Sequence, residues 1–198
     1  MGLVRKILVW VLALCILIVP LLIAAQSPLL AWRQPVYIAA GFSGIIGLGL
    51  LFLQPLLAQG MLPMRSRREA RDLHFWLGLG LIAAVLVHVA GLWITSPPDM
   101  IDALLFRAPT AFSYLGVIAM WAIFLAGGVM VLRKRVALSP IALRLIHRGL
   151  AVVIVATTIA HALLIEGTMG IISKWVLCLF ASLALLKALF DIRRKQRF

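Results

Sequence analysis

Residues 66–95 read SRREARDLHFWLGLGLIAAVLVHVAGLWIT, a long apolar segment that contains two histidines, His74 and His88. The two histidines are 14 residues apart, which corresponds to roughly 21 Å along an α-helix at ~1.5 Å per residue. Fourteen steps of ~100° leave the two side chains only about 40° apart around the helix axis, so they share one face. This segment therefore predicts a membrane-spanning helix with two imidazoles on one side.

A second segment, residues 139–165, repeats the pattern with SPIALRLIHRGLAVVIVATTIAHALLI. Its histidines, His147 and His161, are also 14 residues apart, and these four are all the histidines of the chain. Both segments read R-x-x-H-x13-H. Each begins with a serine suited to cap a helix, eight residues before its first histidine. Equal distances from equivalent caps predict that His74 lies level with His147, and His88 with His161.

The composition of the chain indicates an integral membrane protein. Hydrophobic residues make up 64% of its 198 residues, well above the share in a soluble domain. Six apolar stretches are long enough to cross the ~30 Å hydrocarbon layer. We predict an all-α bundle of six transmembrane helices in a single domain, 1–198. The predicted spans are roughly 5–26, 35–60, 68–95, 111–132, 140–165 and 169–190.

The distribution of charge predicts the topology. Of the 19 lysines and arginines, all but Arg33, Arg107 and Lys174 fall on one side of the predicted bundle. The positive-inside rule then places both termini in the cytoplasm. The net charge of +13 is thus explained by topology and by attraction to anionic membrane lipid, and a nucleic-acid partner is not expected. The segment 96–107, on the outer side, predicts a short interfacial helix.

Two parallel helices with histidine pairs at equal depth predict two bis-histidine haems between the third and fifth spans. Zinc, the first alternative, requires about four ligands within a few ångströms, and two ligand pairs ~21 Å apart do not provide them. A histidine proton relay is the second alternative, but it would normally include membrane-buried carboxylates, and the six acidic residues lie near helix ends or in loops. No C-x-x-C-H motif occurs, so the haem b groups would be held non-covalently by His74, His147, His88 and His161.

The two propionates of each haem require cationic partners. Arg71, Arg144 and Arg148 lie within one turn of the inner histidines and are the candidates for the inner haem. Arg107 and Lys174, with Arg33, are the cations available to the outer haem. Arg71, Arg144 and Arg148 could equally serve only in topology and snorkelling.

Six predicted spans with histidine pairs 14 apart on the third and fifth resemble the ferric reductase-like transmembrane domain over nearly the whole chain. That superfamily includes NADPH oxidases, ferric reductases and the haem subunit of the periplasmic methionine sulfoxide reductase system. The resemblance implies that His74 and His147 bind one haem and that His88 and His161 bind the other. The chain lacks the flavin and NAD(P)H domain of the oxidases and ferric reductases, and its size is closer to that of the haem subunit.

The expected function is transmembrane electron transfer in a bacterial inner membrane. Electrons would come from a cytoplasmic reductase or from quinol, with any flavin or quinone supplied by a partner. They would leave to an acceptor at the outer face, either a metal chelate or a periplasmic protein. The alternatives are a non-catalytic, haem-binding accessory subunit of a larger membrane complex and the haem subunit of a methionine sulfoxide reductase system.

Overall fold

The computed structural model describes residues 2–135 and 138–195, and this part of the chain is helical without strands. Six helices are long and apolar enough to cross a membrane, which indicates a multi-pass membrane protein and confirms the predicted number of spans. A short helix, α4, precedes the fourth of them, so the third and fifth spanning helices are α3 and α6. The helices are α1 (Leu3–Ala25), α2 (Pro35–Ala58), α3 (Arg67–Thr95), α4 (Pro97–Leu104), α5 (Ala111–Val131), α6 (Pro140–Leu164) and α7 (Ile171–Lys195).

The predicted boundaries agree with these helices to within about two residues at most ends, and α7 is the exception. This helix runs to Lys195, beyond the predicted end at residue 190, and so includes the polar sequence DIRRK at 191–195. Apolarity marks the part of a helix that lies in lipid, whereas helical hydrogen bonding continues into polar sequence. Arg197, one of the basic residues on the predicted cytoplasmic side, lies outside the described residues.

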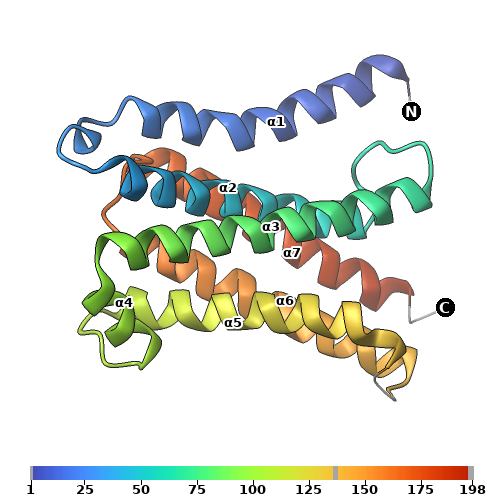
Figure 1. Ribbon diagram of the computed structural model, residues 1–198. Helices are drawn as coiled ribbons and strands as arrows, with labels where there is room; N and C mark the ends of the chain where they lie inside the picture. Colours follow the sequence, from blue (N-terminus) through green and yellow to red (C-terminus); the bar gives the residue numbers. More distant parts are fainter. Residues whose placement is uncertain (1, 136–137, 196–198) are drawn as a thin grey trace.

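The bundle is built from two helical hairpins. Helices α2 and α3 pack closely along their length, as do α5 and α6, whereas α7 packs mainly on α2 and α1 covers the outside of that pair. Figure 1 shows both termini, the α2–α3 connection and the α5–α6 connection at one end of the bundle, with α4 at the other end. Helices α3 and α6 therefore run in the same direction and belong to different hairpins.

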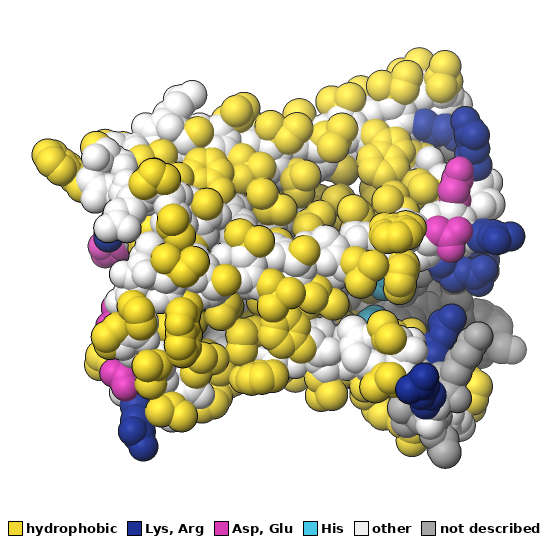
Figure 2. All heavy atoms as spheres, viewed as in Figure 1, with side chains coloured by type: hydrophobic (Ala, Val, Ile, Leu, Met, Phe, Trp, Pro, Cys, Tyr) yellow, Lys and Arg dark blue, Asp and Glu magenta, His cyan; other side chains and the backbone are white. Residues whose placement is uncertain are grey.

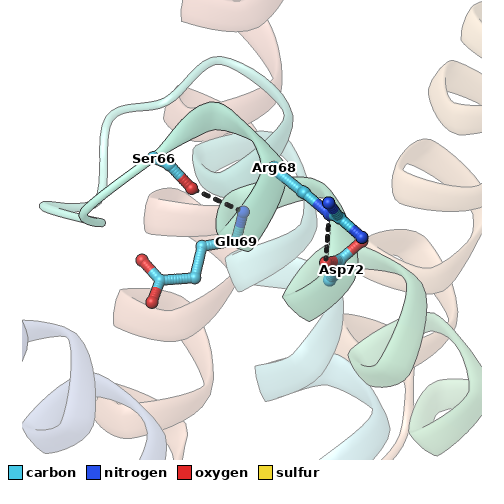
Figure 3. A network of polar contacts seen from close by, with 4 residues as sticks. All are labelled: Ser66, Arg68, Glu69 and Asp72. Atoms are coloured by element: carbon cyan, nitrogen blue, oxygen red, sulfur yellow. Dashed lines mark hydrogen bonds and ion pairs between the residues drawn. The ribbon is translucent and has the colours of Figure 1, made fainter.

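Matched serine caps begin the two histidine-bearing helices. The Ser66 hydroxyl accepts a hydrogen bond from the Glu69 amide at 3.1 Å, and the Ser139 hydroxyl accepts one from the Ala142 amide at 3.1 Å. The Glu69 carboxylate in turn accepts from the Arg65 amide at 2.8 Å, so the reciprocal cap reaches one residue further back than the usual capping box. Figure 3 shows the hydrogen bond between Ser66 and the Glu69 amide beside the exposed ion pair of Arg68 and Asp72.

Charged side chains mark the ends of the bundle. In Figure 2 lysine and arginine side chains gather at the end that holds the termini, and hydrophobic side chains cover the visible sides between the two ends. Such a distribution suits a bundle whose sides contact hydrocarbon and whose ends contact water.

Candidate functional site

The four histidines come together in two pairs between α3 and α6. The ring centres of His74 and His147 are 6.3 Å apart, and those of His88 and His161 are 6.4 Å apart. The equal depth predicted from the serine caps is therefore found in the structure. In Figure 2 imidazole side chains are visible in the crevice between upper and lower helices, toward the basic end.

The separation within each pair matches two imidazoles that share one metal ion. With metal–nitrogen bonds of ~2.0 Å and each ring centre ~1.2 Å behind its nitrogen, the ring centres of two opposed imidazoles lie ~6.4 Å apart. Edge-to-face aromatic pairs have similar separations, so the distance alone does not decide between the two interpretations. The hydrogen bonds of the rings provide the second criterion.

Three of the four imidazoles are anchored through Nδ1 to a backbone carbonyl of the neighbouring helix. His88 Nδ1 lies 2.7 Å from the Ala40 carbonyl oxygen, and His161 Nδ1 lies 2.7 Å from that of Phe112. His74 Nδ1 lies 3.1 Å from the Gln54 carbonyl oxygen. A carbonyl can only accept, so Nδ1 carries the proton, and in the neutral imidazole Nε2 then keeps its lone pair. Metal-ligating histidines show the same arrangement, in which the outer nitrogen donates and the inner nitrogen binds.

The inner pair is anchored less completely than the outer pair. His147 Nδ1 is buried and has no hydrogen-bond partner among the described residues. The side-chain oxygen of Gln54, Oε1, is also buried and unpartnered in that part of the chain, although its Nε2 donates to the His74 carbonyl at 3.3 Å. Only the outer pair therefore has both of its rings fixed by backbone acceptors.

The space between the histidine levels is apolar. Leu81 of α3 and Ile154 of α6 are buried in one cluster with residues of α2 and α5. The backbones of α3 and α6 themselves do not pack closely, because each is paired with its own hairpin partner. The buried side chains of this cluster thus form an apolar layer between the two histidine levels.

No group of three or more His, Cys, Asp or Glu side chains lies together in the described part of the chain. A structural zinc site requires such a group, usually of four ligands. A planar macrocycle requires only one imidazole on each face of its iron. The paired arrangement therefore fits haem better than zinc.

The structure places the predicted inner cations at the basic end of the site. Arg71 and Arg144 are exposed and Arg148 is half-buried. In the described part of the chain none of them forms an ion pair with a carboxylate, whereas nearby Arg68 pairs with Asp72 at 3.9 Å. Their guanidinium groups are thus available to a bound anion, and propionate binding by these residues stays a prediction.

Arg107 and Lys174, two of the three cations available to the outer haem, are placed differently from one another. Arg107 is exposed after α4. Lys174 is half-buried, and its ammonium donates to the carbonyl of Ile165 at 2.5 Å. Ile165 directly follows the last residue of α6 and lies four residues after His161. Lys174 therefore neutralises part of the negative end of α6.

Sequence reasoning missed the backbone acceptors of the histidines and the glycines beside them. The acceptor carbonyls belong to Ala40, Gln54 and Phe112, and no side-chain pattern marks a backbone carbonyl. A usable signal was nevertheless present, because Gly44 and Gly116 precede His88 and His161 by nearly the same number of residues.

Comparison with family models, with curated proteins and with solved structures finds no match for this chain.

Proposed function

We propose that this protein is a dihaem b-type cytochrome of the ferric reductase-like kind, which transfers electrons across a membrane. The observation that supports this most directly is the pair of facing imidazoles at each of two levels, with three of four Nδ1 atoms bound to backbone carbonyls. Haem, when bound, supplies a reversible one-electron iron couple. The Nε2 atoms of His74 and His147 would hold one group, and those of His88 and His161 the other.

The remaining parts of the chain support this function in distinct ways. The backbone acceptors on α2 and α5 hold the rings in orientation, as outer partners do in other metal sites. The apolar layer that contains Leu81 and Ile154 keeps water, and with it protons, out of the interval between the two levels. Arg71, Arg144 and Arg148 would bind the inner propionates, and Arg107 and Lys174 the outer ones.

We place the basic end in the cytoplasm of a bacterial inner membrane, following the positive-inside rule. Electrons would enter there from a separate reductase or from quinol, with flavin or quinone provided by that partner. They would leave at the α4 end to a metal chelate or a periplasmic protein. Outward movement of an electron is favoured by ~2.3 kcal/mol per 100 mV of membrane potential.

Sealed vesicles test this function. Purified protein is placed in vesicles that contain dithionite, and the bleaching of external ferricyanide is followed. Wild-type vesicles should bleach it much faster than empty vesicles, whereas His74→Ala or His88→Ala should return the rate to that of empty vesicles. Thr157→Ala is a control on α6, since its hydroxyl bonds only to its own helix. A wild-type rate equal to that of empty vesicles would overturn the proposal.

A further inference from the structure

We infer that Gly44 and Gly116 are positioning residues for the outer histidine pair, each forming a seat on which one imidazole rests. A seat consists of the glycine and of the carbonyl four residues earlier, Ala40 for Gly44 and Phe112 for Gly116. The inference rests on the proposed function, because it concerns how this chain holds the ligands of the outer haem.

The distances show that each imidazole lies too close to its glycine to leave normal room for a Cβ. A Cβ on Gly44 would lie 3.0 Å from His88 Nδ1 and 3.1 Å from its Cε1. A Cβ on Gly116 would lie 2.7 Å and 2.8 Å from the same two atoms of His161. Real Cβ contacts are rarely this short, so any side chain at either position must displace the ring.

The carbonyl and the glycine of each seat act together. In an α-helix the carbonyl of residue i accepts from the amide of residue i+4, so the Ala40 oxygen already bonds the Gly44 amide. A carbonyl oxygen has a second lone pair, and the Nδ1–H of His88 reaches it at 2.7 Å. The missing Cβ lets the ring approach that lone pair. In the second seat, the missing Cβ of Gly116 lets the His161 ring approach in the same way, and its Nδ1 lies 2.7 Å from the Phe112 carbonyl oxygen.

The repetition of the seat favours a functional origin over incidental helix packing. One seat lies on α2 and serves a histidine of α3, and the other lies on α5 and serves a histidine of α6. Each hairpin thus contains a glycine, a backbone carbonyl four residues before it and a histidine on the partner helix, all at the level of the outer pair. A Cβ on any other glycine of α2 or α5 would meet only aliphatic side chains or nothing within 4 Å; one on Gly47 would lie 3.7 Å from Leu81 Cδ1.

The inner pair has no such seat. In the described part of the chain, a Cβ added to any glycine would not have His74 or His147 among its nearest neighbours, and one on Gly78 would lie 3.5 Å from Gln54 Nε2. Alanine at position 44 or 116 should therefore disturb the outer haem and spare the inner one. Outer-shell substitutions at metal sites typically weaken binding roughly 10–100-fold.

The test uses the full-length purified protein with its haem, and compares Gly44→Ala and Gly116→Ala with crowding controls on the same helices. A Cβ on Gly49 of α2 would lie 2.3 Å from Leu17 Cδ1, and one on Gly127 of α5 would lie 2.7 Å from Ile82 Cδ1. These controls introduce comparable crowding against a flexible aliphatic group. Gly41→Ala and Gly128→Ala add a methyl group in open space. Alanine is the better helix former, so lower helix propensity cannot explain a loss.

Haem content, low-spin electron paramagnetic resonance and redox titration are the readouts. Gly44→Ala and Gly116→Ala should each lose one of two haems, or keep it with a raised midpoint potential, because loss of the Nδ1 hydrogen bond makes the imidazole a poorer electron donor. The haem affected should be the same one whose signal His88→Ala removes from the redox titration. All four control variants should keep both components unchanged.

Three results would overturn the inference, and they are distinguishable. A wild-type protein without haem would overturn the proposed function and the inference together. A wild-type protein with two haems, in which Gly44→Ala and Gly116→Ala match Gly49→Ala and Gly127→Ala, would overturn the inference alone. Equal disturbance of both haems would also contradict it, since it would indicate a general packing defect.

Discussion

At the residue scale, the orientation of three of the four imidazoles depends on a backbone atom rather than on a side chain. His74 is held by the Gln54 carbonyl, and the side chain of Gln54 contributes only a 3.3 Å contact to the His74 carbonyl. The buried Oε1 of Gln54 has no partner in the described part of the chain, which is unfavourable in itself. The backbone acceptor and the side chain of this residue can therefore be separated by mutation.

Gln54→Leu should preserve both haems, because the substitution keeps the backbone carbonyl that accepts from His74. The free energy of unfolding should change by no more than about 1 kcal/mol, since a weak hydrogen bond and an unsatisfied oxygen are removed together. Haem content and thermal unfolding in detergent provide the measurement. Loss of one haem would show that the side chain itself is needed.

At the element scale, two capped helices of matching register set the depth of the histidines. Ser66 and Ser139 fix where α3 and α6 begin, and each first histidine follows its serine by eight residues. The caps lie at the ends of the helices, far from the outer pair. Their contribution should therefore be to stability and not to the identity of the ligands.

Ser66→Ala and Ser139→Ala should each lower the free energy of unfolding by about 1 kcal/mol, the usual value for a lost N-cap. Their effects should add in the double variant, because the two caps belong to separate hairpins. Both haems should remain bound. Ser182→Ala is a suitable control, since its hydroxyl bonds only within α7. A change no larger than that of the control would show that lipid or water replaces the caps.

The sequence predicted those features that repeat along the chain and missed those that depend on packing between helices. Apolar length predicted the six spans, and the cap-to-histidine spacing predicted which histidines face each other. The acceptors at Ala40 and Phe112 could not be predicted in this way, because which carbonyl meets His88 or His161 depends on the rotation of α2 and α5. The contact of Lys174 with Ile165 was missed for a similar reason, since it depends on the turn between α6 and α7.

At the scale of the whole molecule, the two ends of the bundle differ in charge. The end with the termini is strongly basic, whereas Asp99, Asp102 and Glu166 are exposed at the opposite end, near α4 and the end of α6. Under the proposed direction of electron flow, acceptors arrive at the less basic end. Carboxylates at that end would attract a cationic acceptor.

Replacement of Asp99 and Asp102 by Asn and of Glu166 by Gln should slow re-oxidation by an external cationic metal complex. The effect should diminish in high salt, because exposed charges are screened. Reduction from the cytoplasmic side should stay unchanged, and stopped-flow spectroscopy on oriented vesicles measures both steps. A selective slowing of reduction from inside would require the direction of electron flow to be reversed.

The most direct test of the central claim, that two haems are each held by one histidine of α3 and one of α6, is a redox titration of the four histidine-to-alanine variants. Wild-type protein should contain two haems per chain by pyridine haemochrome assay. His74→Ala and His147→Ala should leave the same single component, and His88→Ala and His161→Ala should leave the other. One haem per chain in the wild type would contradict the claim. So would a grouping in which His74→Ala matches His88→Ala and differs from both α6 variants.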